Sequence, residues 1–227
     1  MIPLFYGFDE REEAGAHTFV SSVIHNTSEP VAFTPLDLRS LTKCYGGGQR
    51  DGTNAFIYSR FLVPYLMGYK GFAIFMDGAD MLCRGDIADL WCLRDSYKAV
   101  QVVQHQYQTK ASLKYIGTKM EAKNEDYPCK NWSSVMLINC AHYAWRDITP
   151  GMVEETYGAY LHRFQFIEPR HIGALPKTWN WLDEYGENPD ANLIHWTLGT
   201  PAFKHYQHAP HAKEFVNQFL KVTHVTA

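Results

Sequence analysis

The chain has 227 residues, of which 46% are hydrophobic and 20% charged, and its formal net charge is -3. A chain of this length and composition can bury a sizeable core, and we expect one domain over residues 1–227. Because lysine and arginine form no run and the net charge is slightly negative, no basic field exists to hold a polyanion. Nucleic acid is therefore excluded as an expected partner.

Cysteine usage and the N-terminal stretch indicate the compartment. The odd number of cysteines and the lack of a C-x-x-C pair argue against a disulfide framework and a structural zinc site, so we expect reduced thiols. The N-terminus reaches Asp9 and Glu10 without a basic stretch, and no apolar run approaches the ~20 residues that span a bilayer. We therefore expect a cytoplasmic protein with no membrane span.

In chain order, short apolar runs alternate with segments of helical periodicity. The runs predict strands at residues 2–8, 31–36, 72–76, 99–103, 135–138 and 191–196. Helices are expected at 17–26, at 54–67 with Pro64 bending the end, from the Thr149-Pro150 cap towards Leu161, and at 212–222. This alternation predicts an α/β fold with a largely parallel sheet, in which ligands bind beyond the carboxyl ends of the strands.

A polar loop at residues 42–53 carries three consecutive glycines, Gly46-Gly47-Gly48. No Lys-Ser/Thr pair follows them, so the loop is not a phosphate loop of the Walker type. We interpret it as a linker or a lid.

The strand at 72–76 ends in the acidic turn Asp77-Gly78-Ala79-Asp80. Two carboxylates at a strand end suit Mg²⁺ or Mn²⁺, which binds one or two protein carboxylates and substrate phosphates, and Gly78 and Ala79 are small enough for close ligand approach. Taken alone, the turn is equally typical of a solvated loop in which either aspartate caps the next turn.

The context of the turn resembles the family 8 glycosyltransferases, glycogenin and galactosyltransferase-like enzymes. The matching stretches, in the family's order, are 2–9 (IPLFYGFD), 58–64 (YSRFLVP), 77–80 (DGAD) with 85–91 (GDIADLW), 131–139 (NWSSVMLIN), 175–180 (LPKTWN) and 194–199 (IHWTLG). This resemblance implies a GT-A type, Rossmann-like α/β/α sandwich. It also implies a metal-dependent transferase that moves a hexose from a nucleotide sugar, with a UDP-sugar as the expected donor, to a glycan, protein or small-molecule acceptor, with retention at the anomeric carbon.

Two departures from the family pattern affect the expected site. The family motif is Asp-x-Asp, whereas this chain has Asp-x-x-Asp, and the spacing to Gly85-Asp86 makes Asp80 the firmer ligand and leaves Asp77 one residue early. The Lys-Pro-Trp that follows the histidine motif is replaced by Pro201-Ala-Phe203, with Lys204 displaced by several positions.

The candidate metal ligands are Asp77, Asp80 and His195. A lone histidine at the end of an apolar strand is often only a core residue, but a neutral imidazole with two carboxylates is a reasonable ligand set for Mn²⁺ or Mg²⁺. The metal would act as a Lewis acid that offsets charge developing on the departing diphosphate.

Other candidate residues would hold the nucleotide sugar. Arg60 either reaches the phosphate or ribose or forms an ion pair with Asp86 or Asp89, and Asp9 either accepts from the ribose or base or caps the next helix. Asn131, Ser133 and Asn180 are expected to orient the hexose, because a pocket for hydroxyls needs fixed hydrogen-bond partners. The full set of nucleotide-sugar candidates is Phe8, Asp9, Arg60, Asp77, Gly78, Ala79, Asn131, Ser133, Asn180, Gly199 and Lys204.

Residue types leave the catalytic base open. Glu168, Asp183, Glu184 and His162 are all candidates if the reaction inverts, whereas retention needs no dedicated base. Two rival functions also remain at this stage: a non-catalytic module that binds a sugar nucleotide or glycan, and a metal-dependent phosphohydrolase or nucleotidyltransferase. Neither an Asp-x-Asp-Gly-Thr signature nor a P-loop supports the latter.

Overall fold

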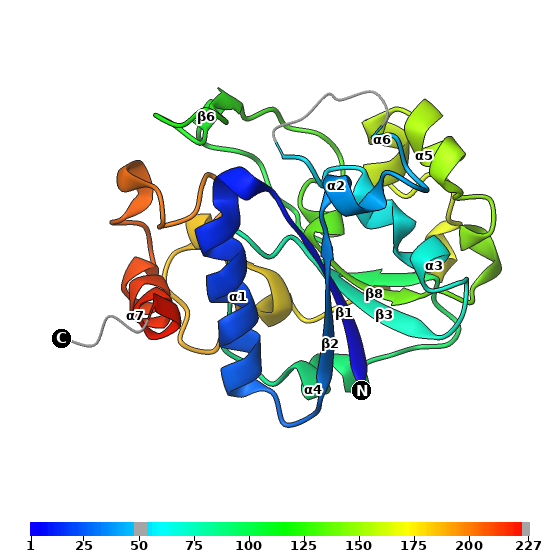
Figure 1. Ribbon diagram of the computed structural model, residues 1–227, viewed down its shortest axis with the longest axis horizontal. Coiled ribbons are helices and arrows are strands. Elements are labelled where there is room, and N and C mark those ends of the chain that lie inside the picture. The colour runs from blue at the N-terminus through cyan, green and yellow to red at the C-terminus, as the bar shows by residue number, and fades with distance from the viewer. Residues whose placement is uncertain (48–53, 224–227) are drawn as a thin grey trace.

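The computed structural model describes residues 1–47 and 54–223 and contains a six-stranded sheet in the order β2-β1-β3-β8-β5-β9 (Figure 1). β1 is parallel to β2 and β3, and β5 is parallel to β9, whereas β8 is antiparallel to both of its neighbours. The predicted α/β fold with a mostly parallel sheet is confirmed. The strands are β1 (Ile2–Gly7), β2 (Val31–Leu36), β3 (Phe72–Met76), β5 (Val100–Val102), β8 (Val135–Asn139) and β9 (Ile172–Ala174).

Helices cover both faces of this sheet. Successive residues of a strand point to opposite sides, and apolar side chains on both sides pack against helices. Leu4, Ile74 and Leu137 join one core with residues of α1 and α4. Phe5 and Phe75 join a second core with residues of α3, α5 and α6. The helices are α1 (Glu13–Asn26), α2 (Leu38–Leu41), α3 (Val63–Leu66), α4 (Ile87–Cys92), α5 (Pro150–Glu155), α6 (Gly158–His162) and α7 (Ala212–Thr223).

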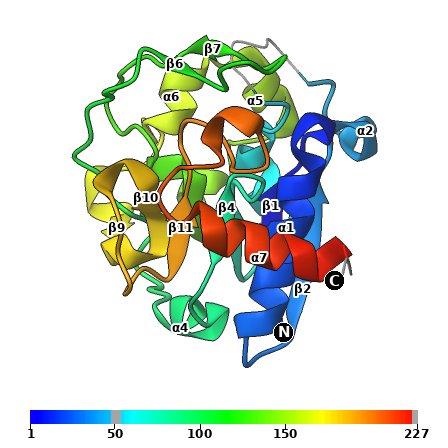
Figure 2. The same cartoon turned by 90° about the vertical axis from the view of Figure 1, so that its left-hand side faces the viewer.

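Two smaller sheets complete the fold. The first has the order β10-β11-β4, with β10 (Trp181–Leu182) parallel and β4 (Met81–Cys83) antiparallel to β11 (Leu193–His195), and α7 packs beside it (Figure 2). The second is the hairpin of β6 (Leu113–Lys114) and β7 (Ala122–Lys123). In both views this hairpin lies at the end of the molecule towards which β1 runs (Figures 1 and 2).

Several predicted elements differ in the structure. Residues 54–67 do not form one helix but a turn, a 3-10 helix at Ser59–Leu62 and then α3, with Pro64 in the first turn of α3, where its missing N–H costs nothing. Thr149 caps α5 as expected, but extended backbone at Thr156 ends that helix before α6. The strand predicted at 191–196 lies in the small sheet, and the sixth strand of the main sheet is β9, whose pattern is too short to recognise.

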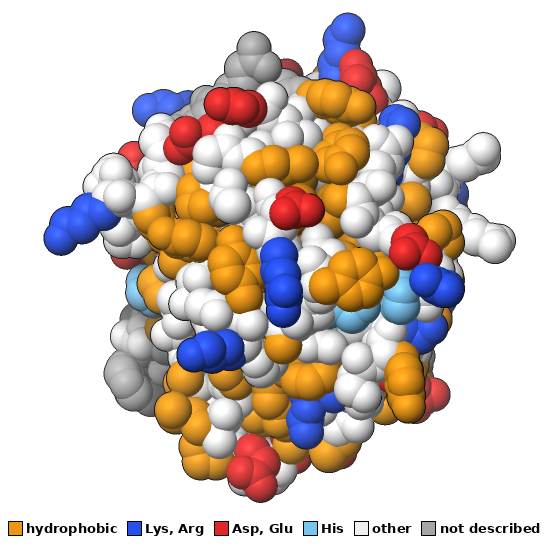
Figure 3. All heavy atoms as spheres, turned by 90° about the vertical axis from the view of Figure 1, so that its right-hand side faces the viewer, with side chains coloured by type: hydrophobic (Ala, Val, Ile, Leu, Met, Phe, Trp, Pro, Cys, Tyr) orange, Lys and Arg blue, Asp and Glu red, His pale blue; other side chains and the backbone are white. Residues whose placement is uncertain are grey.

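The surface and the thiols agree with the composition. Figure 3 shows the side of the molecule that carries α3 and α5, where hydrophobic side chains are interspersed with charged groups of both signs. All five cysteines are free thiols, as predicted.

Within the described residues, every helix is too short or too polar to cross a bilayer. Gly48 and the rest of the proposed lid to residue 53 lie outside the described part of the chain.

Candidate metal and substrate site

The acidic turn connects the large sheet to the small one. Asp77 directly follows β3 and donates its backbone N–H to the carbonyl of Ser134, while Met81 begins β4 and donates to the carbonyl of Gly78. Gly78 has φ of 83°, a left-handed conformation that glycine adopts without strain. The tight turn therefore holds both carboxylates at the end of β3.

His195 reaches this turn through the register of the small sheet. His195 lies opposite Met81 in the antiparallel ladder, and Trp196 donates its N–H to the carbonyl of Asp80 at 2.9 Å. One ligand atom from each of Asp77, Asp80 and His195 then lies within 4.8 Å of the other two. Residues separated by more than a hundred positions thus form one cluster of metal-ligating groups.

The donor set fits a divalent cation. Asp80 is 4% exposed, and its Oδ1 has no hydrogen-bond partner in the structure, although buried carboxylate oxygens normally have one. Its Oδ2 lies 3.5 Å from His195 Nε2. Two carboxylates and an imidazole with atoms left to bind are ligands that Mn²⁺ and Mg²⁺ accept.

Asn180 fixes the orientation of the histidine ring. The Asn180 amide nitrogen donates to the Asn131 carbonyl at 3.1 Å and to Ser134 Oγ at 2.9 Å, so its oxygen is left to accept from His195 Nδ1 at 2.9 Å. Nδ1 therefore carries a proton, and Nε2 is the ring nitrogen that faces the carboxylates. Asn180 is fully buried, so its predicted contact with a hexose is wrong: the amide contacts protein on every side.

Arg60 pairs with neither of the partners predicted for it, Asp86 and Asp89. Its Nη1 lies 2.6 Å from Asp77 Oδ1 and donates to the Ser133 carbonyl at 2.9 Å. Burial raises the pKa of Asp77 to about 6 despite this cation. Arg60 therefore belongs to the site, where it offsets part of the charge of the acidic turn.

Burial and charge act in opposite directions on His195. Burial disfavours the protonated imidazole, but the charge of Asp80 and its hydrogen bond outweigh that effect and raise the pKa of His195. The histidine and Asp80 therefore hold each other in place electrostatically.

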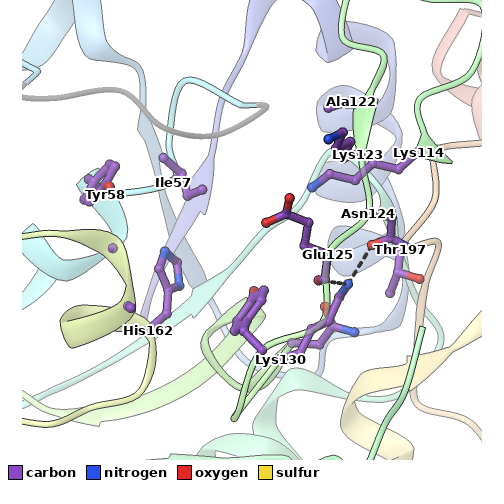
Figure 4. A pocket seen from close by; sticks show the side chains of 14 residues that line it. Ile57, Tyr58, Lys114, Ala122, Lys123, Asn124, Glu125, Lys130, His162 and Thr197 are labelled. Carbon is purple, nitrogen blue, oxygen red and sulfur yellow. Dashed lines mark hydrogen bonds between the residues drawn. The ribbon is translucent and has the colours of Figure 1, made fainter. Parts of the chain in front are cut away.

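Two cavities adjoin the cluster. A small one of about 80 Å³ is lined by Asp77, Asp80, His195 and Arg60, and a larger one of about 570 Å³ extends from it towards the β6–β7 hairpin (Figure 4). They share six lining residues: Ile57, Lys114, Tyr127, Asn131, His162 and Thr197. The predicted residues Asn131 and Ser133 thus lie at the site, and the Asn131 Nδ2 is a buried donor with no hydrogen-bond partner in the structure.

The candidate bases separate clearly. His162 lines both cavities, its Nδ1 lies 2.7 Å from Ser133 Oγ, and burial together with the Arg60 cation holds its pKa well below the usual range. Asp183 is buried, and burial raises its pKa to about 6 although it accepts from the Thr197 N–H. Glu168 is exposed and pairs with Arg170, so the structure does not bring it to the site.

Phe8 and Asp9 lie at a separate cavity of about 220 Å³ beyond the end of β1. Asp9 caps the following 3-10 helix by accepting from the Arg11 N–H, and it also accepts from Arg11 Nε at 2.9 Å and from the Ala55 N–H at 3.0 Å. The Arg39 guanidinium lies 5.9 Å from the centre of the Phe8 ring. Asp9 thus has the capping role that the sequence left open.

Three predicted ligand-contacting residues pack against protein instead. A Cβ on Gly78 would lie 3.2 Å from Tyr6, and Ala79 is fully buried, so neither is small for the sake of a ligand. A Cβ on Gly199 would lie 2.5 Å from the Tyr206 ring.

Lys204, the last of the nucleotide-sugar candidates, lines a different cavity with Ile116 and Phe203. A second cation at the metal cluster, besides Arg60, is Lys114 of β6, which sequence reasoning missed because no local motif surrounds it.

Glu12 is a second acidic group that sequence reasoning missed. It is 3% exposed, and burial, followed by the charge of Asp80, raises its pKa well above the usual range. It lies just before α1, and acidic residues are common at helix N-termini, so the sequence gives no reason to single it out.

The chain is similar to known proteins both in sequence and in fold. Over 225 residues the chain is 36% identical to protein CDI of Arabidopsis thaliana, covering 95% of this chain and 85% of that one. The chain belongs to the protein CDI family. No protein-family model matches it.

This member of the CDI family shares its fold with GT-A glycosyltransferases. The galactosyltransferase LgtC, solved with donor and acceptor sugar analogues, aligns with a TM-score of 0.63 at 12% identity over 99% of this chain and 98% of its own. The bifunctional glycosyltransferase WbbM and GlyE of Streptococcus pneumoniae each align with a TM-score of 0.62 at 13% identity, over 98% and 96% of this chain. The chain spans about half of WbbM (51%) and 60% of GlyE.

Proposed function

We propose that this protein is a metal-dependent glycosyltransferase that transfers a hexose from a nucleotide sugar, a UDP-sugar, to an acceptor, with Mn²⁺ or Mg²⁺ at the acidic turn. The observation that carries the proposal is the convergence of Asp77, Asp80 and His195 beside a cavity at the carboxyl end of β3. The fold shared with LgtC, whose structure holds donor and acceptor sugar analogues, supports it.

The chain's own residues would position the reactants. Asp80 and His195, with Asp77 held by Arg60, would bind the cation, which when bound supplies a Lewis acid for the leaving diphosphate. Without a cation the charges of Asp77 and Asp80 are balanced by Arg60 and Lys114, so a bound dication leaves a positive surplus for a diphosphate.

The nucleoside is assigned to the cavity at Phe8 and Asp9. The Phe8 ring offers an apolar face there, and Arg11 and Arg39 line the same space. A carboxyl end of the first parallel strand is where nucleotides bind in doubly wound folds. The base and ribose would then occupy a cavity that shares no lining residue with the larger one.

Retention completes the proposal and rests on the family resemblance. In that reaction the leaving diphosphate oxygen takes the proton of the attacking hydroxyl, so no side chain needs to act as base. His162, neutral and lining the larger cavity, is then a hydrogen-bond partner for a sugar hydroxyl.

Calorimetry tests the metal bridge. We expect UDP to bind at least about tenfold more tightly in the presence of Mn²⁺ than without it, a difference of about 1.4 kcal/mol in binding free energy. Asp80→Asn should abolish that gain, because it removes a ligand of the cation. Asp147→Asn, at an exposed position away from the cavities, is the matched control. If UDP binds equally with and without Mn²⁺, the proposed site is wrong.

A further inference from the structure

The larger cavity contains more positive than negative charge. Its charged lining residues are Lys114, Lys123 and Lys130 against the single carboxylate of Glu125, and His162 on the opposite wall is neutral. Figure 4 shows Lys114 and Lys130 on one side of this space and His162 and Tyr58 on the other. The cavity is therefore electropositive even though the whole chain has a net charge of -3.

Lys130 is the most unusual of these residues, because it is a buried ammonium without a carboxylate partner. It is 8% exposed, and its Nζ donates to Asn124 Oδ1 and to the Glu125 carbonyl, both at 2.6 Å. An ammonium has three N–H donors, and the third has no oxygen acceptor in the described part of the chain: Nζ lies only near aromatic faces, 5.9 Å from the centre of the Tyr107 ring and 5.7 Å from that of Tyr127. Among residues 1–47 and 54–223 no acidic side chain forms an ion pair with it, although buried lysines are normally paired.

The donor diphosphate does not account for this charge. Lys114 and Arg60 line the small cavity at the metal cluster, whereas Lys123 and Lys130 line only the larger cavity. At about 570 Å³ that cavity has room for a sugar-sized ligand beyond the diphosphate. A second anion, distinct from the donor, would match Lys123 and Lys130.

We infer that the larger cavity takes an anionic acceptor, a sugar or glycan end that carries a carboxylate or a phosphate, with its charge held by Lys130 and Lys123. The inference rests on the proposed transferase function and names the class of its acceptor. Tyr58 and Tyr127, on the walls of the same cavity, would face the apolar side of the sugar ring. The acceptor hydroxyl would then lie towards His162 and the small cavity.

The test compares matched sugars on the protein saturated with UDP and Mg²⁺. Binding of glucuronate and of glucose 6-phosphate is measured against glucose by saturation-transfer NMR. We expect at least one anionic sugar to bind about tenfold or more tightly than glucose, as one charge-assisted hydrogen bond allows. A preference for glucuronate alone identifies a carboxylate acceptor, and one for glucose 6-phosphate alone identifies a phosphate acceptor.

Variants separate this site from general charge effects. Lys123→Gln and Lys130→Gln should each reduce the preference for the anionic sugar towards unity, whereas Lys123→Arg should keep it. Lys119→Gln, an exposed lysine between β6 and β7, is the matched control. Because Lys123 is exposed, its variant tests the inference even if the Lys130 variant fails to fold.

Two outcomes would overturn the inference. One is equal binding of glucose and both anionic sugars by a protein that binds UDP and metal normally. The other is a Lys119→Gln effect as large as that of Lys123→Gln. Loss of metal-dependent UDP binding in the wild-type protein would instead contradict the proposed function, so the two failures are distinguishable.

Discussion

At the scale of single residues, the site depends on hydrogen bonds that place its ligands. Asn180 uses both amide donors on Asn131 and Ser134 and presents its oxygen to His195. An imidazole held in this way keeps Nε2 free for a cation, because the other ring nitrogen carries the proton. The asparagine is thus a positioning residue for the histidine.

Asn180→Ala should therefore weaken metal binding. We expect Mn²⁺ affinity to fall about 10- to 100-fold, the usual cost of removing an outer partner of a metal ligand. Electron paramagnetic resonance of free Mn²⁺ measures the affinity directly. Asn139→Ala is the control, since Asn139 is also buried and hydrogen-bonded but lies at the opposite end of β8. Wild-type affinity in a folded Asn180→Ala protein would show that the ring needs no such support.

At the scale of elements, the first helix and the acidic turn are in direct contact. A Cβ on Gly15 of α1 would lie 1.9 Å from the carbonyl oxygen of Ala79, which is backbone and cannot rotate away. α1 therefore packs against the peptide that separates Asp77 from Asp80. The first helix and the turn that holds the candidate metal ligands are thereby coupled.

Gly15→Ala should push the helix and the turn apart. Overpacking of this kind costs about 1–3 kcal/mol of unfolding free energy, and here it should also lower Mn²⁺ affinity because the turn must move. Gly151→Ala is the matched control within α5, where the added methyl meets nothing within 4 Å and should stabilise by about 0.5–1 kcal/mol. Urea unfolding measures both changes. Unchanged stability of Gly15→Ala would mean that the contact is looser than the structure shows.

At the scale of the whole molecule, buried titratable groups make stability depend on pH in opposing directions. Burial, then the charges of His195 and Lys177, lowers the pKa of His105 to about 3, so below its ordinary value of about 6.5 only the unfolded chain takes up this proton. Acidification then favours unfolding. Burial raises the pKa of Asp77 and Asp183 to about 6. As the pH falls below 6, the folded state therefore takes up these two protons before the unfolded chain does, and this uptake favours folding.

A single variant isolates the histidine contribution. Relative to His105→Gln, the wild-type protein should lose about 2 kcal/mol of unfolding free energy between pH 7.5 and pH 5, at about 1.4 kcal/mol per pH unit below 6.5. The stability of both proteins is measured by urea unfolding at each pH. His17→Gln, at an exposed position on α1, is the matched control. If the unfolding free energy of the wild-type protein does not fall relative to that of His105→Gln on acidification, the lowered pKa of His105 is contradicted.

The sequence by itself determined the strands at 31–36 and 72–76, the α/β class and the three candidate metal ligands. These features are local: each strand is one short, mainly apolar run, and Asp77 and Asp80 stand in a single turn. His195 could be named because the ordered motifs around it are contiguous stretches. The side chains that contact Asp77, Asp80 and His195 could not be derived from local sequence in this way.

Only the tertiary structure decided which side chains surround the ligands. Arg60 pairs with Asp77 rather than Asp86, Asn180 turns to His195 rather than a sugar, and Lys114 takes the position near the metal cluster that Lys204 does not reach. The physical reason is that such partners meet through β-sheet register and loop packing between segments far apart in the chain: Asn180 and His195 are 15 residues apart, and Arg60 and Ser133 are 73 apart. No local periodicity encodes such meetings, because burial and hydrogen bonding between distant segments are settled only when the chain is folded.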